Sequence, residues 1–191
     1  CSSSMVYGNF EKKIVSEEHS TKPIEIYGLA KLSGEIITKG LCKFYGYDYT
    51  IVRPSAVYGP TDINKRVIQI FIERAINNKL IKIKGKNEKL DFTYVEDITE
   101  GFIKAGFSKN GINETFNITY GVGRKLIDVI KILQKDFKNL KYEIEERDSF
   151  RPKRGGLSIA KAKKLLNYIP KNNLETGIRK TLKFYSENSL L

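Results

Sequence analysis

The sequence predicts an α/β protein built from parallel βαβ units, and two observations carry that prediction. Short β-branched or aromatic runs alternate along the chain with longer segments of helical apolar spacing, the order typical of parallel sheets covered by helices. The chain has 191 residues, 40 % of them hydrophobic, which is enough to bury a sizeable core. No apolar run approaches the ~18 residues that a membrane helix needs, so we expect no membrane span.

The first third of the chain contains three recognisable elements. Residues 2–8, Ser-Ser-Ser-Met-Val-Tyr-Gly, are expected to be the end of a buried strand and its turn. Residues 27–45 predict a helix that Gly46 ends. Residues 49–52 predict a short buried strand that stops at Arg53-Pro54. The helix has an apolar stripe on one face, made of Leu29, Leu32, Ile36, Ile37, Leu41 and Phe44.

The remainder of the chain continues the alternation of strands and helices. We expect helices at residues 67–76, 96–107, 126–137, 159–166 and 174–185, and strands at residues 81–83, 91–95, 115–118 and 142–144. The strand at 81–83 is edge-like, because its isoleucines alternate with lysines. Residues 147–156 are basic and contain glycine, which favours a substrate-facing loop.

The charge of the chain favours a small anionic partner. Lys and Arg number 34 against 22 acidic residues, giving a formal net charge of +12, and such a charge first suggests nucleic acid. The excess is lysine, however, with 26 Lys and 8 Arg, and it is spread along a chain also rich in Ile and Asn. We therefore expect no nucleic-acid binding, and a basic cleft that concentrates phosphates instead.

Cysteine and histidine are scarce. Cys1 and Cys42 form no disulfide framework, which fits a reducing cytoplasm. These two residues and the single histidine, His19, are too few for a zinc site, so no metal is expected. We expect His19 to lie in a surface loop, and the N-terminal residues have no secretory signal pattern.

Tyr27 and Lys31 form the first chemical signal. Four residues apart on a helix, they face the same side. A tyrosine of pKa ~10 becomes an effective base near neutral pH only if its pKa falls by about 3 units, roughly 4 kcal/mol. A cation about 4 Å away supplies an interaction of that size at an effective dielectric of ~20, and a tyrosine tuned in this way can act as a general acid/base. Alone, such pairs also arise by chance on solvated helix faces.

Four motifs together carry a resemblance. They are Ser-Ser-Ser-Met-Val-Tyr-Gly at residues 2–8, Tyr-Gly-Leu-Ala-Lys at 27–31, Arg-Pro-Ser-Ala-Val-Tyr-Gly-Pro at 53–60 and Asp-Phe-Thr-Tyr-Val-Glu-Asp at 91–97. In this order and spacing the chain resembles the extended short-chain dehydrogenase/reductase family, specifically its NAD-dependent nucleotide-sugar epimerases and dehydratases. The resemblance covers residues 1 to about 185 and implies a doubly wound, Rossmann-type parallel sheet with a smaller substrate-binding lobe.

The resemblance implies roles for individual residues. Ser3 would hydrogen-bond the sugar oxygen that is oxidised, and Tyr27 would remove its proton. Lys31 would hold the nicotinamide ribose of NAD and lower the pKa of Tyr27. Pro54 and Ser55 would line the nicotinamide side of the site. For the neighbouring Ser2 we expect only a structural hydrogen bond at the strand end.

The family's glycine-rich turn for the dinucleotide pyrophosphate is not found in this sequence. The chain is therefore expected to match the C-terminal ~60 % of an enzyme, to need the upstream segment as a partner, and to be inactive alone. The domain division implied is 1–58 and 91–120 for the C-terminal part of the NAD-binding domain, and 59–90 and 121–191 for the substrate-binding lobe.

Two positions favour epimerisation over the family's other reactions. Dehydratases generally have Asp-Glu where this chain has Ser4 and Met5, and Met5 cannot transfer a proton. We therefore expect an epimerase similar to UDP-glucose 4-epimerase that acts through a transient keto sugar. A dehydratase or reductase remains an alternative. A non-catalytic basic binding or assembly module is an alternative from another class, and a dinucleotide glycine turn upstream would exclude it.

Substrate contacts are harder to predict, because the chain departs from the family at two positions. Ala56 replaces a common Asn, and Leu90 replaces a common Arg. Arg66, Arg151 and Arg154 are then the candidates to bind the diphosphate, although Arg151 and Arg154 could equally lie in a merely solvated loop. The residues expected at the substrate are Ser3, Ser4, Met5, Ala56, Arg66, Val67, Arg151 and Arg154. The resemblance further implies a homodimer and a role in polysaccharide biosynthesis.

Overall fold

The computed structural model describes residues 1–62 and 64–188; residue 63 and residues 189–191 of the expected smaller lobe lie outside the described part. The helices are α1 (Ile26–Tyr45), α2 (Val67–Ile76), α3 (Val95–Phe107), α4 (Leu126–Leu133), α5 (Ala160–Leu166) and α6 (Leu174–Glu187), with 3-10 turns η1 (Ser4–Tyr7) and η2 (Lys109–Gly111). The strands are β1 (Ile14–Val15), β2 (Thr50–Pro54), β3 (Val57–Tyr58), β4 (Ile81–Lys84), β5 (Lys89–Asp91), β6 (Thr93–Tyr94), β7 (Glu114–Ile118), β8 (Gly123–Lys125), β9 (Tyr142–Glu145) and β10 (Gly156–Leu157).

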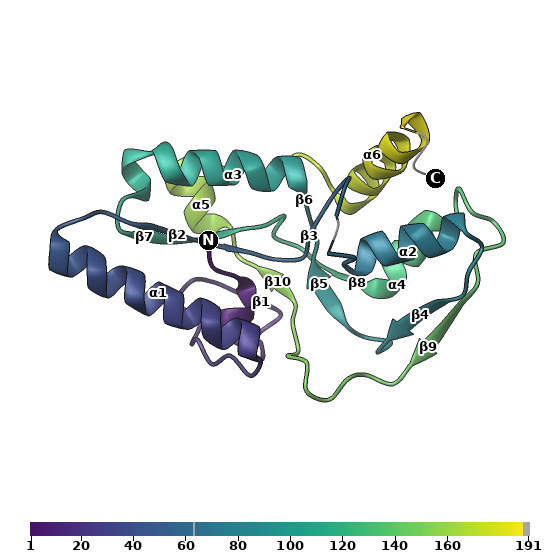
Figure 1. Cartoon of the computed structure of the whole chain (residues 1–191), viewed down its shortest axis with the longest axis horizontal. Helices are drawn as coiled ribbons and strands as arrows, with labels where there is room; N and C mark the ends of the chain where they lie inside the picture. Colours follow the sequence, from purple (N-terminus) through teal and green to yellow (C-terminus); the bar gives the residue numbers. More distant parts are fainter. Residues whose placement is uncertain (63, 189–191) are drawn as a thin grey trace.

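The strands β2 and β7 form the central parallel pair of one half of the molecule, drawn at the left of Figure 1. Thr50 pairs with Glu114 and Pro54 with Ile118, so both strands end at the same edge. Pairing is also parallel between β3 and β6, β4 and β9, and β1 and β10, whereas β5 and β8 are antiparallel. The predicted α/β class with parallel strands is therefore confirmed.

Helices lie on both sides of the β2–β7 pair, with α3 above it and α1 below it in Figure 1. On the α3 side, α5 also packs against the strands. This core contains Val52, Ile98, Ala105, Phe116, Ile118, Ala162, Leu166 and Tyr168. A small separate cluster of Val6, Tyr7, Val15 and Leu157 joins η1 to β1 and β10.

The largest core lies in the other half, among α2, α4, α6 and the strands beside them, at the right of Figure 1. Its members come from residues 58–94 and 126–185. In β4, Ile81 and Ile83 point into this core while Lys82 and Lys84 point outward, as the two-residue period of a strand requires. Among the described residues, no helix is long and apolar enough to cross a membrane.

Two expectations from the sequence were wrong in detail. Residues 4–7 form a 3-10 turn and not a strand end, because the Ser3 side chain caps the turn and Gly8, at φ +67°, ends it. The strand expected at 91–95 is divided at Phe92, since β5 pairs with β8 and β6 with β3.

The apolar stripe predicted for α1 is largely exposed, with Phe44 80 % accessible, although Leu32 packs against the small cluster beside η1. The buried residues of α1 are Gly28 and Glu35.

Candidate active site

A cleft of about 770 Å³ lies where the two halves meet, and most of the predicted site residues line it. One wall comes from the turn before η1, the first turn of α1 and the carboxyl end of β2. The other wall comes from α2, β4 and the loop 147–154. Of the predicted residues, those that line the cleft are Ser3, Tyr27, Pro54, Ala56, Arg66, Val67, Arg151 and Arg154.

Four predicted residues lie beside the cleft and are not part of its lining: Ser4, Met5, Lys31 and Ser55. The side chains of Ser4 and Ser55 are buried in the protein. Met5 is half-buried and lies within the 3-10 turn η1 that Ser3 caps. Lys31 lies one helical turn beyond Tyr27.

Ser3 is held by its own turn. It is buried, and its Oγ accepts a hydrogen bond from the Met5 backbone N–H at 3.2 Å. Since a hydroxyl also has one proton to donate, Ser3 can still donate a hydrogen bond to an oxygen in the cleft. The 3-10 turn thereby orients this hydroxyl.

Tyr27 and Lys31 form the expected pair on α1. The Lys31 Nζ lies 5.7 Å from the centroid of the Tyr27 ring and donates to the Cys1 carbonyl at 3.1 Å. Gly28 allows α1 to approach η1, because a Cβ at this position would lie 2.6 Å from the Met5 carbonyl oxygen. This close packing brings Tyr27 to the same cleft as Ser3. The Tyr27 side chain is 54 % exposed, so its hydroxyl is accessible to a substrate.

A buried ionic network supports this arrangement from behind. The Arg53 guanidinium donates to both carboxylate oxygens of Glu35, at 2.8 and 2.6 Å, and to the Tyr7 hydroxyl at 3.0 Å. Tyr7 donates in turn to the Asn117 side chain at 2.7 Å, and the Ser2 hydroxyl donates to Glu35. The network joins η1, α1, β2 and β7, and it gives Ser2 the structural hydrogen bond expected for it.

The charges of this network are fixed by its geometry. Burial raises the pKa of the Glu35 carboxyl, but hydrogen bonds from Arg53 and Ser2 and the Arg53 charge together bring that pKa below its usual value. Burial likewise raises the pKa of the Tyr7 hydroxyl to about 12, with Arg53 opposing the rise. At neutral pH the network therefore contains one cation, one carboxylate and a neutral phenol.

Asp91 is a second buried carboxylate, but its partners carry no charge. It accepts hydrogen bonds from the backbone N–H groups of Leu157 at 2.9 Å and Gly121 at 3.1 Å, and from the Thr119 hydroxyl at 3.1 Å. Burial raises its pKa to about 6 although these bonds lower it. Asp91 thus connects β5 to the segment after β7 and to β10, where the basic loop returns to the core.

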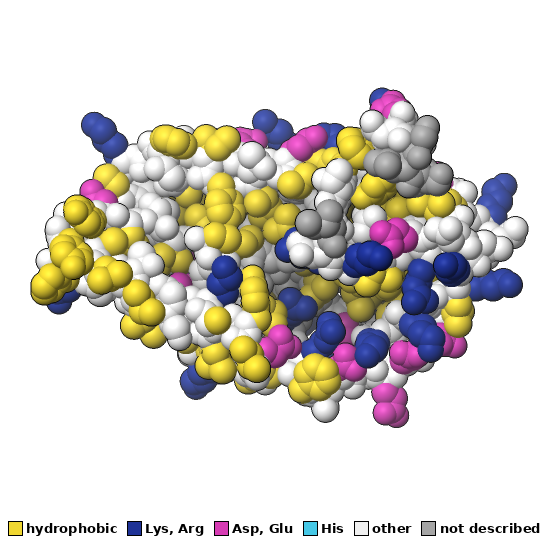
Figure 2. Space-filling model, in the orientation of Figure 1, with side chains coloured by type: hydrophobic (Ala, Val, Ile, Leu, Met, Phe, Trp, Pro, Cys, Tyr) yellow, Lys and Arg dark blue, Asp and Glu magenta, His cyan; other side chains and the backbone are white. Residues whose placement is uncertain are grey.

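The cleft is strongly cationic. Figure 2 shows Lys and Arg side chains gathered around a hollow near α2, β4 and β9. Seven basic residues line the cleft against the two carboxylates Glu88 and Asp148. These carboxylates pair with some of the basic residues, including Arg147 and Arg151. Among the described residues, neither Arg66 nor Arg154 pairs with a carboxylate, so a surplus of positive charge faces the cleft.

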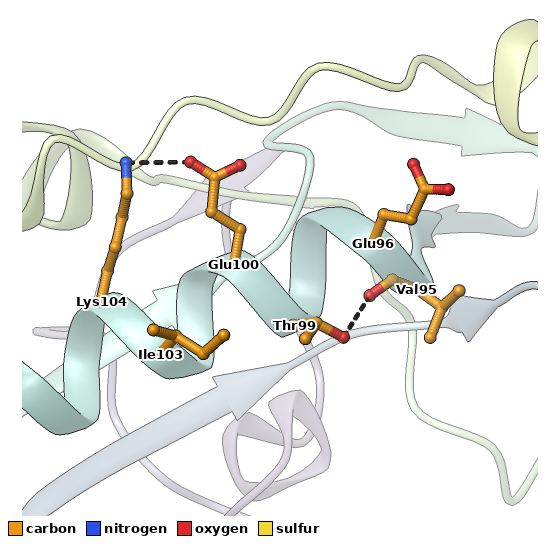
Figure 3. Close-up of a pocket in the computed structure, with 6 residues that line it drawn as sticks. All are labelled: Val95, Glu96, Thr99, Glu100, Ile103 and Lys104. Atoms are coloured by element: carbon orange, nitrogen blue, oxygen red, sulfur yellow. Dashed lines mark hydrogen bonds and ion pairs between the residues drawn. The ribbon is translucent and has the colours of Figure 1, made fainter.

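A second hollow, of about 480 Å³, lies on α3 away from these residues (Figure 3). All of its lining residues belong to one helix, and its polar groups are engaged with each other: Lys104 pairs with Glu100 at 3.0 Å, and Thr99 donates to the Val95 carbonyl at 2.9 Å. It contains none of the predicted site residues. In the described part of the chain, no three His, Cys, Asp or Glu side chains gather as metal ligands.

Sequence reasoning missed several residues of this region. Glu35 was not singled out, although it is the one acidic residue between 26 and 45 and lies four residues after Lys31. Lys82 and Lys84 were interpreted only as an edge pattern, yet both line the cleft. The alternation of these lysines with Ile81 and Ile83 could have indicated this role, because it places both lysines on the same face of the strand.

A parallel sheet with a polar cleft beyond the carboxyl ends of its strands defines the class of nucleotide-binding α/β folds. Within that class, the chain matches the NAD dependent epimerase/dehydratase family over residues 1–119. The chain belongs to this family.

Individual relatives support the same placement. An uncharacterized UDP-glucose epimerase of Bacillus subtilis, YtcB, is 29 % identical over 97 % of this chain and 59 % of its own length. The structure of Thermotoga maritima UDP-glucose 4-epimerase with UDP-glucose matches with a TM-score of 0.91 at 28 % identity, over 98 % of this chain and 62 % of that one. UDP-glucuronic acid 4-epimerase from Bacillus cereus, in complex with UDP-glucuronic acid and NAD, gives 0.90 at 29 % identity, over 98 % and 60 %.

These matches confirm the doubly wound, Rossmann-type fold predicted from the sequence. The chain spans about 60 % of the length of these relatives.

Proposed function

We propose that the full-length protein is an NAD-dependent epimerase that inverts one hydroxyl-bearing carbon of a nucleotide-diphosphate sugar. The observation that carries the proposal is that one cleft contains Ser3 and Tyr27 together with a surplus of basic side chains. A hydroxyl and a phenol suit proton removal from a sugar hydroxyl, and basic residues suit a diphosphate. The family supports NAD as the cofactor.

The proton chemistry belongs to Tyr27 and Ser3. Tyr27 removes the proton of the sugar hydroxyl and returns it after the sugar has turned, while Ser3 holds the same oxygen by a hydrogen bond. Lys31 places a cation beside this phenol, with its Nζ 5.7 Å from the centroid of the Tyr27 ring. Bound NAD would supply the hydride acceptor for the sugar carbon and the hydride donor for its reduction from the opposite face.

The nicotinamide half of NAD fits the residues present. Pro54 and Ser55 lie at the carboxyl end of β2, where ligands bind in such sheets, and Pro54 shares the cleft with Tyr27. We propose that these two residues line the nicotinamide and that Lys31 holds its ribose. A glycine-rich segment outside this sequence would bind the pyrophosphate.

The residues beside Ser3 support epimerisation over dehydration. The Met5 thioether can neither give nor take a proton, and its Sδ is contacted by Arg154 at 3.4 Å. The Ser4 side chain is buried. Water elimination needs an acid and a base beyond Tyr27, and no carboxylate occupies these two positions.

For the substrate, we propose that Arg66 and Arg151 bind the diphosphate and that Ala56 and Val67 lie against the nucleotide sugar. The expected division into a cofactor domain and a substrate lobe, with the cleft between them, remains part of the proposal. We also propose that the full-length protein forms a homodimer and has a role in polysaccharide biosynthesis. A cytoplasmic location is part of the proposal as well, and the sparse cysteines support it.

The test is product analysis by NMR. The full-length protein is incubated with NAD and, separately, with UDP-, dTDP- and GDP-hexoses, and we expect an equilibrium mixture of two hydroxyl epimers from at least one of them. Tyr27→Phe should lower kcat about 10²- to 10⁴-fold, since it removes the acid/base group. Net loss of water or CO₂ without an epimer would contradict the proposal.

A further inference from the structure

Arg154 differs from the other arginines of its loop. Arg147 and Arg151 each pair with a carboxylate. The Arg154 Nε, by contrast, is fully buried and has no hydrogen-bond partner among the described residues. Its Nη1 contacts the Met5 Sδ at 3.4 Å, and a thioether is only a weak acceptor. The guanidinium thus has no carboxylate in hydrogen-bond contact among the described residues, and the charges of Glu25 and Glu88 act on it only from a greater distance.

An uncompensated buried charge is unfavourable, and in a protein it is normally paired. Burial lowers the pKa of the Arg154 guanidinium, and the charges of Glu25 and Glu88 oppose this shift. Arg154 also lines the cleft, so a ligand can reach the guanidinium. An anionic group of a ligand would supply the missing partner, and a planar guanidinium suits a carboxylate or phosphate through two parallel hydrogen bonds.

The position of Arg154 decides which anion that is. Met5, which it contacts, donates its backbone N–H to the Ser3 hydroxyl. Arg154 therefore lies at the end of the cleft where Ser3 holds the reacting hydroxyl. In a hexopyranose, carbon 1 and carbon 4 are on opposite sides of the ring, and carbon 6 is attached to the neighbour of carbon 4. With the 4-hydroxyl at Ser3, the diphosphate at carbon 1 would point away from Arg154, and of the substituents next to carbon 4 only carbon 6 can be a carboxylate.

We propose that Arg154 binds a carboxylate at carbon 6 of the sugar and makes the enzyme selective for nucleoside-diphosphate uronates. This inference rests on the proposed function, because it uses the same cleft and the same position of the reacting hydroxyl. Arg66 at the start of α2 is the contrasting residue, since it is exposed and donates to the Val57 carbonyl at 3.4 Å. We expect it to bind the part of the substrate that all nucleotide sugars share.

The experiment measures binding of UDP-glucuronate, UDP-glucose and UDP to the full-length protein by calorimetry. The wild type should bind UDP-glucuronate more tightly than UDP-glucose. Arg154→Gln should weaken UDP-glucuronate binding about 100-fold, because a charged pair is lost, and should change UDP-glucose and UDP affinity less than about threefold. The matched control, Arg66→Gln, should weaken all three ligands by similar factors. Circular dichroism and thermal melting verify that both variants are folded.

Equal weakening of all three ligands by Arg154→Gln would overturn the inference, since it would mean a diphosphate contact. A wild type that does not prefer UDP-glucuronate would overturn it as well. Product analysis separates the two proposals: selective UDP-glucuronate binding that depends on Arg154, with no epimer formed, would refute the proposed epimerase and support the binding role of Arg154.

Discussion

Arg53 is buried and Arg154 is partly buried, but the surroundings of the two guanidinium groups are opposite. Arg53 donates to both oxygens of Glu35 and to the Tyr7 hydroxyl. Arg154 has a buried Nε without a partner and a weak contact with Met5. Arg53 lies behind the site and joins α1 to β2, whereas Arg154 faces the cleft.

The difference separates a structural charge from a ligand-binding one. A buried charge whose hydrogen bonds are all made within the protein fixes the position of its neighbours, and its removal leaves another charge unpaired. A buried charge with unused donors has a cost in the free protein that a bound anion offsets. The first kind should therefore be detected in stability and the second in binding.

The largest effect should follow from breaking the Arg53 network. Arg53→Met leaves the Glu35 carboxylate buried without its cation, and we expect the free energy of unfolding to fall by about 3–5 kcal/mol. Denaturant titration of the full-length protein measures it. A loss below about 1 kcal/mol would mean that the network is solvated and that Arg53 does not have the structural role assigned to it.

Two of the buried carboxylates, Glu35 and Asp91, extend the comparison to the pH dependence of stability. Because the pKa of Asp91 is raised from 3.8 to about 6, the folded state keeps its proton where the unfolded chain has lost it. Stability from Asp91 should therefore fall as pH rises from about 4 to about 6, by up to about 3 kcal/mol.

Glu35 should act in the opposite sense, because its pKa is lowered: its contribution is lost as the pH falls below the unfolded value of 4.5. Asp91→Asn, measured by urea unfolding at several pH values, should remove the slope between pH 4 and 6. An unchanged slope in this variant would show that another group causes it.

A double-mutant cycle should show how strongly Arg53 and Glu35 are coupled. Glu35→Leu leaves Arg53 unpaired, and Arg53→Met leaves Glu35 unpaired, whereas the double variant leaves no buried charge at this place. The double variant should therefore be more stable than the sum of the two single losses predicts, by about 2 kcal/mol. Strict additivity of the unfolding free energies would refute direct coupling.

The smallest effect on stability is expected at Arg154. Arg154→Met removes a desolvated charge without leaving a carboxylate unpaired, so the free energy of unfolding should change by less than about 1 kcal/mol, or rise. The same denaturant titration measures it. A loss as large as that of Arg53→Met would show that Arg154 has a structural partner and no special role toward ligand.

The sequence predicted the order of the main elements and most of the residues that meet in the cleft. The prediction was accurate where local rules are sufficient. The helical spacing of apolar residues predicted a helix at 67–76, which are the bounds of α2. The four-residue interval between Tyr27 and Lys31 placed both side chains on one face of α1. Ser3 could be predicted because the motif that contains it has a fixed position relative to Tyr27.

What remained hidden depends on contacts between distant segments. The strand at 91–95 is divided because its two parts pair with different strands, which no local pattern shows. The local sequence around Glu35 does not distinguish a buried carboxylate from a solvated one, because its burial depends on the position of Arg53. The absence of an anionic partner for Arg154 likewise becomes visible only when the loop 147–154 is placed against η1.

A crystal structure of the full-length protein with NAD and UDP-glucuronate tests the central comparison most directly. We predict that the Arg154 guanidinium donates two hydrogen bonds to the carboxylate at carbon 6 of the sugar, with the 4-hydroxyl between Ser3 and Tyr27, while Arg53 keeps both bonds to Glu35. Arg154 bound to the diphosphate, or directed away from the sugar, would contradict the account.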